Sequence, residues 1–93
     1  MKKRFEYDFD DESRQNQLSF ELSGKERLTT DIQGPGASIF VNREASAVLA
    51  RIFAKMALSN YPDGFHVHLR RDLDSDDDTG DVLTIFLNEK TEK

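Results

Sequence analysis

The feature that most constrains the fold is a change of hydrophobic period at residue 42. After it, apolar side chains recur at the spacing of an amphipathic α-helix, at Ala45, Val48, Leu49, Ile52, Phe53, Met56 and Ala57. The side-chain oxygen of Asn42 can cap the first turn of this helix, and residues 60–64 end it and turn the chain. The spacing therefore predicts one helix over residues 43–58.

The residues before this helix alternate with period two, which is typical of strands with one buried face. Aromatic side chains alternate with acidic ones over residues 5–9, and large apolar residues alternate with serine and glutamate over 18–22. The alternation continues over residues 27–32, and a short β-rich run follows at 37–41 after a Gly-Pro-Gly break. This pattern predicts four strands joined as an antiparallel meander.

Two further strands are predicted after the helix. Apolar residues alternate with polar ones over residues 65–70, and residues 82–87 are apolar on both faces. The order β-β-β-β-α-β-β predicts an α+β fold, a two-layer sandwich in which one helix packs on one face of a mainly antiparallel sheet of about six strands. Residues 1–93 are expected to form a single domain with a polar C-terminal tail at 88–93.

Composition excludes several classes of protein. The 93 residues include no cysteine, so neither a disulfide framework nor a cysteine nucleophile can form. No apolar run approaches the roughly 20 residues of a membrane span, and the first residues lack the apolar region of a secretory signal. The net charge of −5 disfavours nucleic-acid binding. We therefore expect a cytoplasmic protein that binds neither a membrane nor a nucleic acid.

Two histidines mark the first candidate site. On a strand, His66 and His68 point to the same face, together with Arg70. The plainest interpretation is that they make hydrogen bonds on a polar sheet face, and the functional interpretation is a face that contacts a partner. Neutral imidazole is also a common metal ligand. A metal site is the weaker alternative, because Arg70 would repel a cation and no motif supplies a third ligand.

An acidic run marks the second candidate site. Six aspartates lie within ten residues between Asp72 and Asp81. The run fails the EF-hand pattern, because Asp77 stands at the glycine position and Leu83 at the glutamate position. A solvated hairpin loop is the plainest interpretation. The alternative is a negative arm that attracts a basic protein partner, formed by Asp72, Asp74, Asp76, Asp77 and Asp78.

No enzyme signature accompanies these sites. The sequence has no nucleophile elbow, no Walker loop and no dinucleotide-binding fingerprint. We therefore predict no catalytic residue, no metal and no cofactor. Ala47, Ala50 and Ala54 form a flat stripe that can pack against a second copy, so a homodimeric domain stays an alternative, as does a metal-binding or small-ligand-binding domain centred on the two histidines.

The second half of the chain also carries a recognisable order of elements. A strand ending in Asn42, an amphipathic helix, the strand Gly64-Phe65-His66-Val67-His68-Leu69, an acidic loop and a final strand follow one another over residues 37–88. This order resembles one family of immunity proteins from bacterial polymorphic toxin systems, although Val41 stands where that family has a small residue. The resemblance implies a cytoplasmic protein that binds and inhibits a cognate toxin. An acidic surface would speed its association with a basic toxin.

Overall fold

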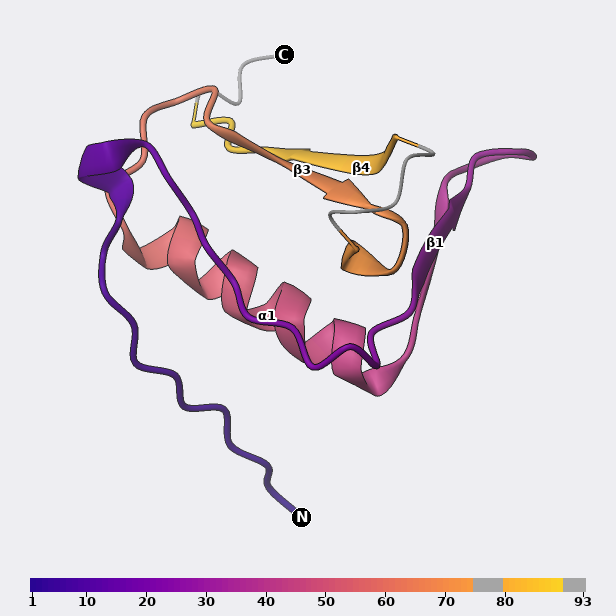
Figure 1. The fold of residues 1–93 in the computed structure, drawn as a ribbon, viewed down its shortest axis with the longest axis horizontal. Coiled ribbons are helices and arrows are strands. Elements are labelled where there is room, and N and C mark those ends of the chain that lie inside the picture. The colour runs from indigo at the N-terminus through magenta and orange to yellow at the C-terminus, as the bar shows by residue number, and fades with distance from the viewer. Residues whose placement is uncertain (75–79, 90–93) are drawn as a thin grey trace.

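The structure, a computed structural model, describes residues 1–74 and 80–89. It combines one α-helix with two separate two-stranded antiparallel sheets, so the chain is α+β (Figure 1). Among the described residues, no helix has the length and apolar character needed to cross a membrane. The elements in chain order are η1 (Ser13–Gln15), β1 (Leu28–Asp31), β2 (Ser38–Val41), α1 (Arg43–Leu58), β3 (His66–Arg70), η2 (Arg71–Leu73) and β4 (Asp81–Phe86).

Helix α1 spans Arg43–Leu58, which confirms the prediction from the hydrophobic period. Its N-cap is Asn42, whose Oδ1 accepts a hydrogen bond from the N–H of Ala45 at 2.9 Å. Glu44 in the first turn and Lys55 in the last turn complement the helix dipole. The buried side chains follow helical spacing, at Ala45, Val48, Ile52, Lys55 and Met56.

The core lies between α1 and the inner side of the β3–β4 hairpin. Val67 and Leu69 alternate inward along β3, and Leu28 joins them from the first position of β1. Leu73 in η2 closes the same cluster, with 4% of its surface exposed. Burying a leucine or isoleucine side chain in this way contributes about 1.5–3 kcal/mol relative to leaving it in water.

Four of the six predicted strands form. The β1–β2 ladder is antiparallel and pairs Leu28 with Val41 at one end. The β3–β4 ladder is also antiparallel and pairs His66 with Phe86 at one end, with an irregularity near Leu69. Within the described part of the chain the two ladders do not join into one sheet.

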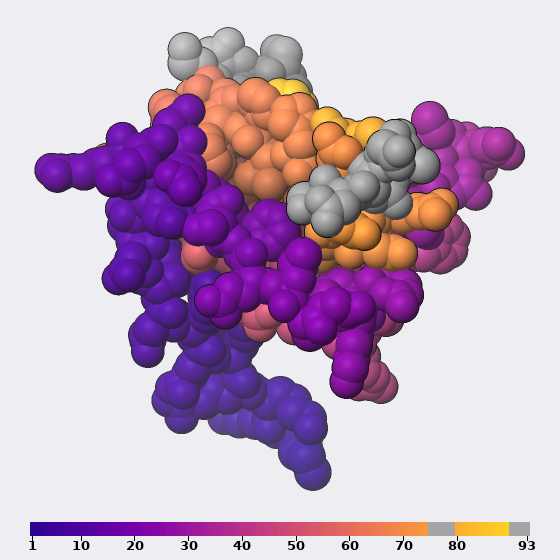
Figure 2. All heavy atoms as spheres, viewed as in Figure 1, coloured from indigo at the N-terminus to yellow at the C-terminus, as the bar shows by residue number. Residues whose placement is uncertain are grey.

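The predicted six-stranded sandwich is therefore wrong. Residues 5–9 and 18–22, expected to be the first two strands, belong to no ladder within the described residues. Residues 18–22 instead pack through Leu18 and Phe20 against the core, and the first residues extend from the body as an arm (Figure 2). A period of two indicates that one face of a segment is apolar. Here other side chains cover part of that face without a neighbouring strand, and Phe5 and Leu22 stay exposed.

A buried carboxylate shapes the turn before β1. Glu26 is only 4% exposed, and it accepts hydrogen bonds from the N–H and hydroxyl of Ser23 at 2.8 and 3.0 Å and from the N–H of Gly24 at 3.0 Å. The Ser23 N–H, the largest of these influences, holds the pKa of Glu26 below its ordinary value. A buried carboxylate needs this number of donors to offset its loss of water.

Asn42 joins three elements through one side chain. Besides capping α1, its Oδ1 accepts from the N–H of Arg27 at 3.0 Å, and its Nδ2 donates to the carbonyl of Lys25 at 2.8 Å. Its backbone N–H donates to the carbonyl of Arg27 at 3.2 Å. The start of β1, the end of β2 and the start of α1 are thereby fixed to one another.

Substitutions of Asn42 test how much its side chain contributes to stability. Asn42→Ala removes the cap and two tertiary hydrogen bonds, and we expect the free energy of unfolding to fall by about 2 kcal/mol or more. Asn42→Asp keeps the acceptor oxygens and loses the donor to Lys25, so the expected loss is smaller. Urea unfolding measures both, with Asn60→Ala, an exposed asparagine beyond the helix, as the control. Equal losses for Asn42→Ala and Asn60→Ala would contradict the account.

Candidate functional site

The predicted histidine face exists and points to solvent. Along β3 the burial alternates, so that His66 and His68 are exposed while Val67 and Leu69 face the core. The ladder places Phe86 opposite His66 and Thr84 opposite His68. We call this surface, made of His66, His68, Arg70, Thr84 and Phe86, the outer β3–β4 face.

Aromatic rings form the centre of the outer β3–β4 face. The rings of His66 and His68 meet edge to face with centroids 4.8 Å apart, and the Phe86 ring lies 4.9 Å from that of His66. Phe86 stays 63% exposed, although a phenylalanine in a stable monomer gains most by burial. The centre of the face is therefore an apolar and aromatic surface that water still covers.

Polar and charged groups form the edge of this face. The Nδ1 atom of His68 lies 2.9 Å from a carboxylate oxygen of Asp81 and 3.3 Å from the hydroxyl of Thr84. The Nε of Arg70 lies 3.9 Å from the other oxygen of Asp81. The side chains of His68, Arg70 and Asp81 are each more than a third exposed, so these contacts add little to stability.

The surroundings of the two imidazoles bear on the metal alternative. The Nδ1 of His66 lies 3.1 Å from the carbonyl oxygen of Gly64, and the Nδ1 of His68 faces Asp81. Over residues 1–74 and 80–89, no group of three or more histidine, cysteine, aspartate or glutamate residues is placed to hold a metal ion. The two imidazoles thus have hydrogen-bonding partners and lack a third ligand among the described residues.

The predicted acidic arm divides into parts with different surroundings. Asp72 adopts a left-handed conformation with φ 55°, and its Oδ1 accepts a hydrogen bond from the N–H of Leu28 at 2.8 Å. Its carboxylate therefore serves as a tether to β1. Asp74 is exposed and lines a surface hollow with Arg27. Asp76, Asp77 and Asp78 lie outside the described residues.

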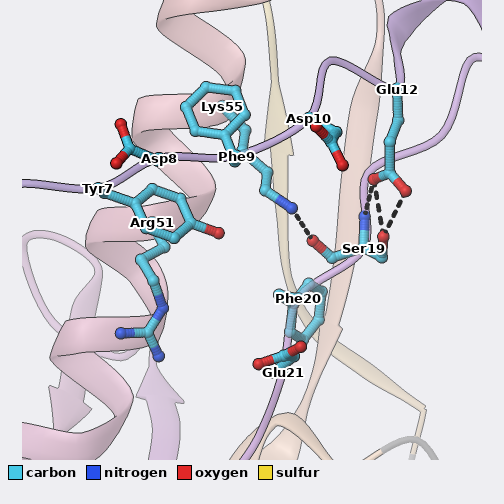
Figure 3. Close-up of a pocket in the computed structure, with 10 residues that line it drawn as sticks. All are labelled: Tyr7, Asp8, Phe9, Asp10, Glu12, Ser19, Phe20, Glu21, Arg51 and Lys55. Atoms are coloured by element: carbon cyan, nitrogen blue, oxygen red, sulfur yellow. Dashed lines mark hydrogen bonds between the residues drawn. The ribbon is translucent and has the colours of Figure 1, made fainter.

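The structure also contains a groove that the sequence did not indicate. It has a volume of about 660 Å³ and lies between the N-terminal segment, residues 19–21 and α1 (Figure 3). The guanidinium of Arg51 lies 6.0 Å from the centroid of the Tyr7 ring, and the ammonium of Lys55 lies 5.9 Å from that of Phe9. These cation–π contacts attach the N-terminal segment to the helix.

Lys55 is the central residue of the groove. It is 8% exposed, and its Nζ donates to the carbonyl of Ser19 at 2.6 Å, the contact that Figure 3 draws. The Ser19 hydroxyl and N–H in turn bond the Glu12 carboxylate at 2.7 and 2.9 Å. Lys55, Ser19 and Glu12 therefore satisfy one another, which indicates a structural role. The one feature of the sequence that could have indicated this groove is Lys55, a lysine adjoining the apolar stripe of the helix.

The Glu12 contacts give a testable pH dependence. The Ser19 hydroxyl, and after it the Ser19 N–H, holds the pKa of Glu12 below its ordinary value of 4.5. A carboxylate with a lowered pKa in the folded state stabilises the fold above its unfolded pKa, and this stabilisation is lost as the pH falls through the folded pKa. We therefore expect Glu12→Gln to be less stable than wild type at pH 7, with the difference shrinking below about pH 4.5.

Urea unfolding between pH 3 and pH 7 measures this difference. The control is Glu21→Gln, which removes an exposed carboxylate that lines the same groove. A stability difference between Glu12→Gln and wild type that stays constant over this pH range would show that the Glu12–Ser19 contact does not form.

Comparisons of the chain with models of known protein families, with curated proteins and with solved structures found no match. The resemblance of residues 37–88 to immunity proteins therefore stays a prediction.

Proposed function

We propose that this chain is a protein-binding module and that the outer β3–β4 face is its main contact surface. The observation that carries the proposal is the exposed aromatic centre formed by His66, His68 and Phe86. Aromatic residues and arginine are enriched at the energetic centres of protein interfaces, and polar groups typically surround them. The outer β3–β4 face has this composition, with Arg70 and Asp81 at its edge.

Preorganisation supports the same proposal. His68 contacts Asp81 and Thr84, and its ring and the ring of Phe86 both lie against that of His66. Side chains that are already ordered lose less conformational entropy when a partner covers them. The face sits on a ladder whose opposite side is packed on the core, so its backbone is also held in place.

The finer proposal is that the partner is a basic bacterial toxin and that binding inhibits it. Its support is the resemblance of residues 37–88 to immunity proteins, together with the net charge of −5. The aspartates of the 72–81 run lie next in sequence to β3 and β4. Negative charge beside an aromatic contact surface would attract a basic partner over a long range and then leave the rings to make the close contact.

Binding measurements with matched phenylalanine variants test the contact face. Where a toxin gene adjoins the gene for this chain, the probe is the purified toxin domain that it encodes. Phe86→Ala removes the exposed ring from the outer face, and we expect the Kd to rise about tenfold or more. Phe53→Ala removes a ring on α1 that is 51% exposed, and we expect no change in Kd.

Two results would contradict the proposed contact face, and a third would contradict the immunity assignment. Equal affinities of wild type and Phe86→Ala would exclude the outer β3–β4 face as the main contact. A loss confined to Phe53→Ala would move the contact surface to α1. A toxin that binds without losing its activity would leave the binding module standing and would remove the immunity assignment.

A further inference from the structure

Strand β2 is the most exposed regular element of the described structure. All four of its residues are exposed, with Ile39 at 48%, Phe40 at 57% and Val41 at 39%. The β1–β2 hairpin to which it belongs projects from the body (Figures 1 and 2). The unpaired backbone N–H and C=O groups of an open strand are a template for pairing with another chain, and exposed apolar side chains favour that pairing.

The hydrogen-bond phase of the β1–β2 ladder shows which groups of β2 are free to pair. The N–H of Asn42 donates to the carbonyl of Arg27 at 3.2 Å, so these two residues form a bonded pair. Bonded and non-bonded pairs alternate along an antiparallel ladder, and Phe40 therefore directs its backbone N–H and C=O toward β1. Its neighbours Ile39 and Val41 direct theirs away from β1.

The opposite edge of the hairpin is formed by β1. Its hydrogen bonds agree with this alternation, and other elements cover it. Leu28 pairs with Val41, and its N–H points away from β2 and donates to the Asp72 carboxylate at 2.8 Å. The hydroxyl of Thr30 donates to the carbonyl of Val82 at 3.2 Å. Elements η2 and β4 thus cover β1, whereas no strand within the described ranges pairs with the outer edge of β2.

The charge distribution indicates what kind of chain fits this edge. The ten residues from Gln33 to Asn42 carry no charge, in a chain of which 33% is charged. Natural edge strands often carry a lysine or a bulge that prevents pairing, and β2 has no lysine and pairs in regular register. Because each copy has a net charge of −5, two copies meet with least repulsion where neither is charged. An uncharged strand offers no such advantage to a basic partner.

We propose that β2 is a homodimer interface at which two copies pair antiparallel about Phe40. In this register Ile39 of each copy lies opposite Val41 of the second copy, and their outward N–H and C=O groups form the bonded pairs. The two Phe40 residues face each other as the non-bonded pair, where side chains approach most closely. The result is one continuous four-stranded sheet in the order β1-β2-β2-β1. This interface is separate from the outer β3–β4 face.

Sedimentation equilibrium with matched lysine variants tests the interface. Wild type is expected to show twice the 10.7 kDa mass of one chain, and Ile39→Lys to sediment as a single chain. The control Ile32→Lys changes an isoleucine that is 79% exposed on the same hairpin but lies outside β2, and it should remain dimeric. A wild-type monomer at millimolar concentration overturns the proposal and leaves the edge to a different partner. A dimer that resists Ile39→Lys overturns it as well.

A disulfide experiment decides the register and does not depend on the folding of Ile39→Lys. Because the chain contains no cysteine, Phe40→Cys places one thiol per copy on the proposed axis. The Cα atoms of such a pair lie about 4.5 Å apart, within the range that a disulfide bridges. With oxidised glutathione, Phe40→Cys should become a linked dimer, while the control Thr29→Cys, opposite Phe40 on β1, stays monomeric. Equal linking of the two variants, or none with Phe40→Cys, overturns the proposal.

Discussion

The side chain of Asn42 is the contact on which the arrangement of this domain depends. No shared sheet orients the helix, the first hairpin and the turn before it, since the two ladders are separate within the described residues. A single amide caps α1 at Ala45, holds Arg27 at the start of β1 and bonds Lys25. An amide can do this because it is both donor and acceptor, a combination that a serine or aspartate cap lacks at the required reach. Burial of Leu28 against Val48 and Ile52 then becomes possible.

Hydrophobic periodicity has two different meanings in this chain. The helical period over residues 43–58 predicted α1 correctly, because a helix bonds its own backbone and needs only one covered face. The period of two predicted a strand correctly only where a second strand was present to pair with it. Residues 5–9 and 18–22 alternate as regularly as β3 does, yet rings, cations and the core cover only Tyr7, Phe9, Leu18 and Phe20, and Phe5 and Leu22 stay exposed. Alternation marks the apolar side of a segment and does not specify what covers it.

The sequence likewise predicted some features of the candidate site and missed others. The alternation around His66 and His68 was enough to place both on one face, and their exposure follows from the burial of Val67 and Leu69. Phe86 could not be assigned to that face, because the sequence does not specify the register of β3 with β4. Asp72 appeared to belong to an acidic arm, but a left-handed backbone turns its carboxylate toward Leu28. The outer edge of β2 is open because no strand of the described structure pairs with it. A local sequence pattern does not encode whether such a strand is present.

Native-state hydrogen exchange, followed by NMR at single amides, tests the central claim most directly: that α1 and side-chain contacts, and not one continuous sheet, organise the N-terminal half. The account predicts slow exchange for Val67 and Leu69 in the β3–β4 ladder, and fast exchange for Tyr7, Phe9, Phe20 and Leu22, because exposure of backbone hydrogen-bonding groups to water controls local protection. Protection of the four N-terminal amides as strong as that of Val67 and Leu69 would show a ladder there. That result would contradict the account and restore a larger sheet.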